Sequence, residues 1–397
     1  WRHICIRPEL KLQPCCRFLD DGSEMPSLQD YNSDLDIALY VPFFQNLRSL
    51  ALRGDAIDGC AKCMRLEKNG LQSLRLSANS AYARSTDESL RASADSICDL
   101  EIFVGSTCNL RCLPCNPHLS TAWQVEYRKL GKTFKPLRDS HFDTQRLISQ
   151  MPNLERIKFV GGEPFLSSKH FEIISELTKK DISQMQLVYY TNVTVWPSVE
   201  IFEAWKQAKE IQLWLSIDGY GAVNDYIRFP SQWEKVEENT IRFLEFTKDC
   251  PNLKIGLNCT VCIYNIFSVR ILQQWFTEIL RKYSRTNCLG IYLNALIEPT
   301  HMDICNLPLD LKVKAESNLD VSYSQQRDLS VLLKNPGNSN LLQKFVKFTR
   351  TLDGLDKKTL LMWSPNWHPY FRLYFVVHTN VNLVFIAMRK KLRGIYL

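Results

Sequence analysis

The sequence predicts an α/β fold in which parallel strands alternate with helices. From about residue 97 onward, short apolar stretches alternate with longer segments whose apolar residues recur at helical spacing. Strands and helices in this alternation form parallel βα units. The chain has 397 residues, 45% of them apolar, which is enough for a substantial core and for two or three domains.

Six strands are expected in the alternating region. They lie at residues 100–104, 156–160, 186–190, 211–217, 254–261 and 290–295. The helices between them are expected at residues 169–180, 199–209, 233–247 and 268–283. Because the carboxyl ends of parallel strands meet at one edge of a sheet, groups that follow these strands should share one rim.

A cysteine triplet follows the first of these strands. Cys108, Cys112 and Cys115 have the spacing CxxxCxxC. Three thiolates so close in sequence can hold a soft metal centre at three corners and leave a fourth position open. A structural zinc site normally has four protein ligands, so an iron-sulfur cluster with one exchangeable iron is the preferred interpretation. The alternatives are a zinc knuckle and three buried thiols.

Further polar and glycine-rich groups mark the ends of the next three strands. Gly161-Gly162-Glu163 follows the second strand, Thr191-Asn192 follows the third, and Ser216 lies at the end of the fourth. Each motif alone is also typical of an ordinary turn. Their common position after strands predicts that they gather beside the cysteine loop.

Four longer motifs contain these groups and occur in a fixed order after the triplet. They are Gly161-Gly162-Glu163-Pro164, Tyr190-Thr191-Asn192, Ser216-Ile217-Asp218-Gly219 and Tyr226-Ile227-Arg228. With the triplet, they resemble the radical S-adenosylmethionine (radical SAM) enzymes, whose hallmark is CxxxCxΦC with Φ usually a large apolar residue. Pro114 departs from that pattern at Φ. The resemblance implies a partial (β/α)6 barrel of the TIM type over residues 96–300.

The resemblance also implies roles for individual residues. The three cysteines would hold three irons of a 4Fe-4S cluster, and S-adenosylmethionine would chelate the fourth iron. Glu163 and the backbone of Gly161 and Gly162 would bind the ammonium group of S-adenosylmethionine, and Arg228 would pair with its carboxylate. Asn192 and Ser216 would hydrogen bond to the ribose or carboxylate. The alternatives are a surface salt bridge for Arg228 and a turn for Asn192.

Residues 1–75 differ in composition and carry a second group of cysteines, namely Cys5, Cys15, Cys16, Cys60 and Cys63. This segment resembles the twitch/SPASM module that binds an auxiliary iron-sulfur cluster. The resemblance implies Cys15, Cys60 and Cys63 as ligands, with Cys16 as the alternative to Cys15. The fourth ligand is either Cys5 or a residue upstream of Trp1, since a first residue other than Met suggests a longer reading frame. A zinc ribbon is the alternative for the whole module.

The expected function is reductive cleavage of S-adenosylmethionine to a 5′-deoxyadenosyl radical that abstracts hydrogen from a substrate. A peptide or protein substrate and an external electron donor such as a flavodoxin or ferredoxin are implied by analogy. The alternative is a non-catalytic iron-sulfur or zinc protein in redox sensing or RNA binding. No catalytic acid, base or hydrogen donor is identified; the candidates are Cys259, Cys262 and Cys305, which are more typical of core thiols.

The net charge, the cysteines and the apolar runs indicate which partners and which compartment to expect. A net charge of +7 from 49 basic and 42 acidic residues is compatible with nucleic-acid binding and does not argue for it. Fourteen cysteines in ligand-like spacings favour a reducing cytoplasm. The apolar run at residues 373–388 is shorter than the ~20 residues of a membrane helix, so no membrane span is expected.

Residues 301–397 form a C-terminal extension without a predicted site, and the turn-rich segment 363–369 is expected to cap a core.

Overall fold

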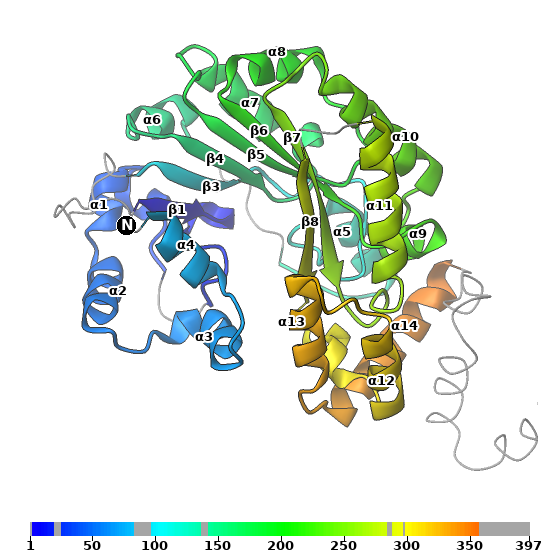
Figure 1. Ribbon diagram of the computed structural model, residues 1–397. Coiled ribbons are helices and arrows are strands. Elements are labelled where there is room, and N and C mark those ends of the chain that lie inside the picture. Colours follow the sequence, from blue (N-terminus) through cyan, green and yellow to red (C-terminus); the bar gives the residue numbers. More distant parts are fainter. Residues whose placement is uncertain are drawn as a thin grey trace, which may run out of the picture. The chain divides into compact units, whose positions relative to one another are not determined.

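The computed structural model describes residues 2–19, 25–82, 97–135, 142–283, 288–296 and 298–356 (Figure 1). The expectations for residues 363–369 and 373–388 fall outside this part of the chain. None of the helices within the described residues combines the length and the apolar character that crossing a bilayer requires.

The predicted α/β class is confirmed, since strands and helices alternate around one open, mostly parallel sheet. Its strand order is β2-β1-β3-β4-β5-β6-β7-β8. The six predicted strands are β3 Asp99–Phe103, β4 Arg156–Val160, β5 Gln186–Thr191, β6 Glu210–Ser216, β7 Leu253–Val261 and β8 Cys288–Ala295. Consecutive strands from β3 to β7 pair in parallel. This order agrees with a partial barrel that does not close.

The N-terminal segment contributes two strands to the same sheet. β1 His3–Ile6 pairs in parallel with β3, and β2 Leu12–Gln13 pairs antiparallel with β1. The helices of this segment are α1 Leu35–Leu39, α2 Pro42–Arg53, α3 Ala61–Lys68 and α4 Leu74–Tyr82. The cysteine-rich segment is therefore joined to the barrel strands by backbone hydrogen bonds, and its boundary at residue 75 stays a prediction.

The helices between β3 and β8 in the described residues are α5 Thr121–Lys129, α6 Thr144–Ser149, α7 Ser168–Leu177, α8 Val199–Gln207, α9 Ala222–Ile227, α10 Trp233–Phe246 and α11 Val269–Tyr283. Four of them, namely α7, α8, α10 and α11, begin and end close to the predicted positions, whereas α5, α6 and α9 were not predicted. The C-terminal part contains α12 Leu309–Ser317, α13 Ser324–Leu333 and α14 Ser339–Asp356. Within the described residues the chain divides into two compact units, one from residues 1–217, 228–259 and 273–292, and the other from residues 218–227, 260–272 and 293–397.

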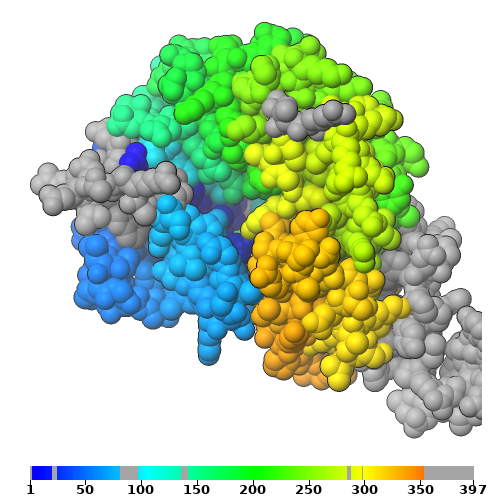
Figure 2. Space-filling model, viewed as in Figure 1, coloured from blue at the N-terminus to red at the C-terminus, as the bar shows by residue number. Residues whose placement is uncertain are grey.

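One face of the sheet in the first unit is apolar and covered by helices. Ile157, Phe159 and Tyr189 point to this face and are fully buried. Phe159 packs against His170 of α7, and Tyr189 packs against Trp205 of α8. The side chains of the helices drawn in green form a continuous outer surface in the space-filling view (Figure 2). Burial of this face supplies the main driving force for folding of the unit.

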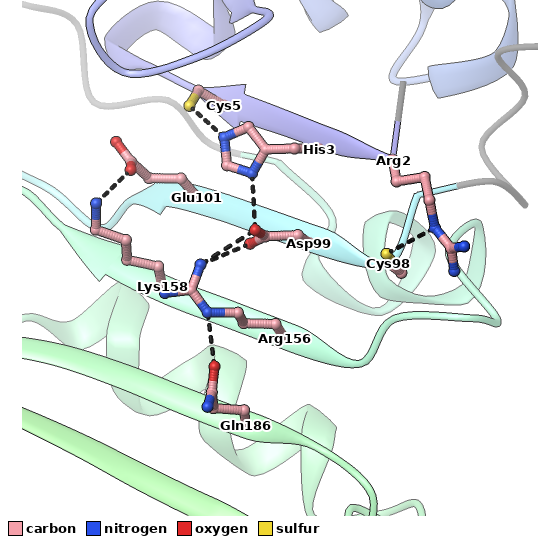
Figure 3. A network of polar contacts seen from close by, with 9 residues as sticks. All are labelled: Arg2, His3, Cys5, Cys98, Asp99, Glu101, Arg156, Lys158 and Gln186. Carbon is pink, nitrogen blue, oxygen red and sulfur yellow. Dashed lines mark hydrogen bonds and ion pairs between the residues drawn. The ribbon is translucent and has the colours of Figure 1, made fainter. Parts of the chain in front are cut away.

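The opposite face of the sheet carries many polar side chains, which is unusual for parallel strands because both of their faces are commonly apolar. Alternate residues of each strand lie on this face. The polar and aromatic ones are Asp99 and Glu101 on β3, Arg156 and Lys158 on β4, Gln186 and Tyr190 on β5, and Glu210, Gln212 and Trp214 on β6, and the apolar Phe103, Val160 and Val188 lie among them. The charged ones pair across the strands, as shown for β1 to β5 in Figure 3.

The second unit has its own core. Tyr264 packs against Phe345 of α14 with ring centroids 4.8 Å apart, and its hydroxyl hydrogen bonds to Thr349 at 2.6 Å. His301 is 6% exposed and packs edge-on against Phe348. These contacts bury one face of α14 in the unit.

Candidate functional site

The cysteine loop is fixed at the start of α5, which the sequence reasoning did not single out. Ser120 caps the helix by accepting from the Trp123 backbone nitrogen, and its hydroxyl donates to Leu110 O at 2.6 Å. The Trp123 indole nitrogen donates to Cys112 O at 2.8 Å. The loop is thus held by side chains that lie just beyond it in sequence, and a cap residue followed by a buried Trp was the available signal.

Arg111 is a second residue that the motif analysis missed. It is 3% exposed, pairs with Glu126 at 3.5 Å, and lies 4.2 Å from the ring centroid of Phe229. Its backbone nitrogen donates to Phe229 O at 2.7 Å. The cysteine loop is therefore tied to the segment that carries Arg228, although more than a hundred residues separate them.

The glycine pair after β4 permits a close approach between two backbones. Gly161 has φ +136°, and a Cβ at this position would lie 2.4 Å from Gly105 O. A Cβ on Gly162 would lie 2.2 Å from Thr107 O. The backbone nitrogens of Gly162 and Glu163 donate to Gly105 O and Thr107 O, both at 2.8 Å. This loop is consequently packed against the start of the cysteine loop, as its position after the strand predicted.

Replacing Gly161 should therefore cost more stability than replacing a glycine with an open surrounding. For Gly161→Ala we expect the free energy of unfolding to fall by roughly 2 to 5 kcal/mol, because the cost of a strained backbone conformation and the cost of overpacking add to each other. Gly131→Ala is the matched control, since Gly131 also has positive φ but a Cβ there would meet no atom within 4 Å; its loss should be about 1 kcal/mol. Denaturant unfolding measures both, and equal losses would contradict the packing argument.

Glu163 has a fully buried carboxylate that bridges the loops after β4 and β5. Its Oε1 accepts from Thr191 Oγ1 at 2.9 Å and from Phe165 N at 3.4 Å, and its Oε2 accepts from Asn192 N at 2.7 Å. Burial raises the pKa of Glu163 to about 7, although the hydrogen bonds and Arg228 oppose the rise. A carboxylate offers about four acceptor positions, so one remains for an amino group.

Asn192 connects the end of β5 to the cysteine loop. Its Nδ2 donates to Asn109 Oδ1 at 2.9 Å and lies 3.9 Å from Cys108 Sγ. Its Oδ1 accepts from the backbone nitrogen and the hydroxyl of Thr194. The turn role and the site role therefore coincide in one residue. Ser216 closes β6, where it pairs in register with Asn258.

Arg228 is buried beside the cysteine loop, so the surface salt bridge considered for it does not apply. It is 9% exposed, and its Nη1 lies within hydrogen-bond reach of Cys112 Sγ at 3.9 Å. Burial raises the pKa of Cys108, and that of Cys115 to about 11, while the Arg228 guanidinium lowers both. A fixed positive charge beside the thiols favours their anionic form, which is the form that binds metals.

The cysteine loop does not have the arrangement of side chains that binds a single metal ion. No three His, Cys, Asp or Glu side chains among the described residues converge closely enough to hold one metal ion. His118 lies three residues after Cys115, and its exposed ring packs edge-on against Phe134. The donor set of three thiols beside a buried carboxylate and a guanidinium fits an iron-sulfur cluster that also binds an amino acid group.

The N-terminal cysteines lie near one another. Burial raises the pKa of Cys15 to about 12, and the nearby thiols of Cys16, Cys60 and Cys63 add to the rise. The contact between the two halves of this group depends on Gly59, because a Cβ there would lie 2.2 Å from the Phe18 ring. Cys15 and Cys16 lie on one segment, and Cys60 and Cys63 lie at the start of α3, within electrostatic reach of Cys15.

The three cysteines considered as hydrogen donors lie in cores. Cys259 and Cys262 are fully buried, and burial raises the pKa of Cys262 to about 12. Cys305 is 8% exposed and donates to Leu332 O at 3.2 Å. Their placement matches the core role that is usual for isolated cysteines.

Comparison with known proteins finds similarity at the level of solved structures. No family model and no curated protein matches the chain. Streptococcus suis SuiB bound to S-adenosylmethionine is 15% identical, with a TM-score of 0.35, over 58% of this chain and 45% of SuiB. The protein anSMEcpe with bound AdoMet is 18% identical, with a TM-score of 0.38, over 66% of this chain and 62% of that protein. Both neighbours were solved with S-adenosylmethionine bound.

The chain spans less than two thirds of the length of either neighbour. TYW1 with a lysine-pyruvate adduct is a further neighbour, 13% identical with a TM-score of 0.30, over 53% of this chain and 68% of TYW1. At these scores the roles of individual residues have to come from the geometry of this chain.

Proposed function

We propose that the protein is a radical SAM enzyme that cleaves S-adenosylmethionine reductively. The observation that supports this most is the connected arrangement at the carboxyl ends of β3, β4 and β5. There, the Glu163 carboxylate accepts from the Asn192 backbone nitrogen, the Asn192 amide lies 3.9 Å from Cys108 Sγ, and the Arg228 guanidinium lies 3.9 Å from Cys112 Sγ. A zinc knuckle requires neither the carboxylate nor the amide nor the guanidinium.

Each side chain has a role that follows from its chemistry. Cys108, Cys112 and Cys115 hold the cluster, which when bound supplies one electron to break a carbon–sulfur bond of S-adenosylmethionine. Glu163 accepts a hydrogen bond from the amino group of the cofactor, and Arg228 pairs with its carboxylate through a planar fork. Asn192 and Ser216 orient the remaining polar groups. Trp123 and Arg111 position the cysteine loop, and the glycine pair holds Glu163 against it.

The polar face of the sheet is the proposed substrate surface, and a peptide or protein is the proposed substrate. Charged side chains on this face offer partners for backbone and side-chain groups, and Tyr190 and Trp214 stack with ring centroids 6.4 Å apart. SuiB has been solved with the precursor peptide SuiA. A flavodoxin or ferredoxin is the proposed electron donor, and an auxiliary cluster at the N-terminal cysteines is the proposed second centre. The cytoplasm is the proposed compartment, because thiol centres persist under reducing conditions.

The test is cleavage of S-adenosylmethionine by the anaerobically reconstituted protein. With dithionite we expect release of 5′-deoxyadenosine and methionine, and without a reductant we expect neither product. Chromatography of the quenched reaction measures both. If protein with an intact cluster releases no 5′-deoxyadenosine under dithionite, the proposal is wrong, and a non-catalytic iron-sulfur protein becomes the better interpretation.

A further inference from the structure

Val193, the residue after Asn192, has a strained backbone conformation. Its φ is +66°, and its side chain is fully buried. For a residue with a Cβ the left-handed region is disfavoured by about 5- to 30-fold in population, and a β-branched residue there is a clear outlier. Strain of this kind persists only where surrounding contacts hold it, and it is concentrated at functional sites. Other parts of the unit must therefore hold Val193 in place.

The contacts that hold Val193 come from α10. Asn239 is fully buried, and its Nδ2 donates to Val193 O at 2.7 Å. Arg242 Nη1 donates to Asn239 Oδ1 at 3.3 Å. Because a guanidinium only donates, this contact leaves the Nδ2 of Asn239 for the loop. The Arg242 guanidinium also lies 3.9 Å from the ring centroid of Trp196. One turn of α10 thus clamps the loop that follows β5.

The conformation of Val193 sets the hydrogen bonds of the residues around it. Three consecutive backbone nitrogens donate to side chains, namely Asn192 N to Glu163 Oε2 at 2.7 Å, Val193 N to Thr191 Oγ1 at 3.1 Å and Thr194 N to Asn192 Oδ1 at 2.9 Å. A change of φ at Val193 rotates Asn192 relative to Thr194. At least one of these hydrogen bonds would then break.

This turn also directs the Asn192 side chain to the cysteine loop. Because Thr194 donates to Asn192 Oδ1, the Nδ2 of Asn192 faces the other way, toward Asn109 Oδ1 at 2.9 Å and Cys108 Sγ at 3.9 Å. Asn109 Nδ2 donates to Thr194 Oγ1 at 2.8 Å, which closes the ring of contacts. Relaxation of Val193 would therefore withdraw the Asn192 amide from the cysteine loop.

We propose that Asn239 is a positioning residue of the S-adenosylmethionine site, which holds Val193 in its left-handed conformation and so fixes the Asn192 amide beside the cysteine loop. The identity of the ligand rests on the proposed function, whereas the placement of the loop is independent of it. Without the clamp, the backbone preference of residue 193 sets the fraction of protein that is ready to bind. The apparent dissociation constant rises in inverse proportion to that fraction.

The test removes Asn239 in three backgrounds that differ only at residue 193. In the parent, Asn239→Ala should weaken S-adenosylmethionine binding by about 5- to 30-fold. In the Val193→Gly background the same change should weaken binding less than about threefold, because glycine adopts the left-handed region readily. In the Val193→Ala background, which also loses the two methyl groups but keeps the Cβ, the loss should again be about fivefold or more. Calorimetric titration of reconstituted proteins with matched iron content measures these affinities.

A second measurement needs neither cluster nor cofactor. Amide hydrogen exchange, followed by mass spectrometry of the peptide that contains residues 192–194, reports on the three backbone hydrogen bonds. Asn239→Ala should accelerate this exchange by about fivefold or more, and Val193→Gly should cancel the effect of losing Asn239. Thr240→Val is the matched control, because the Thr240 hydroxyl is also fully buried on α10 but donates to Val236 O at 2.7 Å within the helix. It should change neither affinity nor exchange.

A merely structural role for Asn239 predicts a different pattern. Its loss would then have the same effect in all three backgrounds, and this result overturns the proposal, as does unchanged affinity and exchange in Asn239→Ala. If Asn239→Ala does not fold, Asn239→Asp takes its place, since the carboxylate keeps the shape and the Arg242 contact but cannot donate to Val193 O. If the parent with an intact cluster does not bind S-adenosylmethionine, the proposed function fails, and hydrogen exchange still decides whether Asn239 positions the loop.

Discussion

Replacing Cys108, Cys112 and Cys115 together with alanine is expected to abolish release of 5′-deoxyadenosine, to the level found without protein. In the proposed function these three thiolates would hold the cluster, so no cluster should form in the triple variant. Iron content should fall by about 4 atoms per chain, the content of one cysteine-bound 4Fe-4S cluster. Chromatography and iron analysis measure the two effects.

Cys288→Ala is the control for this experiment, because Cys288 is an exposed thiol at the start of β8. It should retain both the iron and the activity. If the triple variant kept all of its iron, the assignment of the cluster to this loop would be wrong. If it lost the iron but still released 5′-deoxyadenosine, the cleavage reaction would belong to another centre.

Local pattern was sufficient to predict most strands and helices of the first unit. β4 was predicted at its observed bounds, and α8 and α10 begin where the helical spacing begins. The gathering of the motifs also followed from sequence, since parallel strands place their carboxyl ends together. Glu163 and Asn192 meet at 2.7 Å for this reason.

Contacts between distant segments could not be predicted in the same way. β1 has four residues, two of them His3 and Cys5, and its pairing with β3 depends on a register that no local pattern encodes. The same is true of Arg111, whose partner Phe229 lies far along the chain. A buried arginine needs a carboxylate and a flat surface, and the sequence does not show where these will be found.

The polar face of the sheet relates the two thiol groups of the first unit. Lys158 pairs with Glu101 at 2.7 Å and lies 5.1 Å from the ring centroid of Tyr190, the residue before Thr191. Burial is the main cause of the raised pKa of Cys16, and Lys158 acts in the opposite direction by lowering that pKa. One lysine is therefore within electrostatic reach of both the N-terminal thiols and the end of β5.

Glu163→Gln is expected to weaken S-adenosylmethionine binding about tenfold or more at pH 8. Asn192 N and Thr191 Oγ1 donate to different oxygens of the carboxylate, and the amide replaces one of these oxygens by an NH2 group that cannot accept. The substitution also removes the negative charge that would pair with the amino group of the cofactor. Charge-assisted hydrogen bonds are worth about 1.5 to 3 kcal/mol. Each 1.4 kcal/mol is about a factor of ten in affinity.

The pH dependence of binding should distinguish this charge from a packing effect. Burial raises the pKa of Glu163 to about 7 from its ordinary value of 4.5. Below pH 7 the folded protein carries the protonated, neutral side chain, so the parent should bind more tightly as pH rises from 6 to 8. The dissociation constant should fall by up to about tenfold per pH unit below the pKa and level off above it. In Glu163→Gln this dependence should disappear.

Stability should change with pH in the opposite direction. Between pH 4.5 and about 7 the folded state holds a proton on Glu163 that the unfolded state has lost. Rising pH therefore favours unfolding in this window, and the parent should lose stability relative to Glu163→Gln as the pH increases. Denaturant melts at pH 5 and pH 8 measure the difference between the two proteins.

The binding experiment is calorimetric titration of S-adenosylmethionine into reconstituted proteins with matched iron content. Glu172→Gln is the control, because Glu172 on α7 also accepts from a threonine hydroxyl, that of Thr144, and lies outside the proposed site. It should bind like the parent at each pH. Equal affinity and an equal pH profile for Glu163→Gln and the parent would remove Glu163 from the cofactor site and leave it as the carboxylate that joins the loops after β4 and β5, since its three protein hydrogen bonds are sufficient for that role.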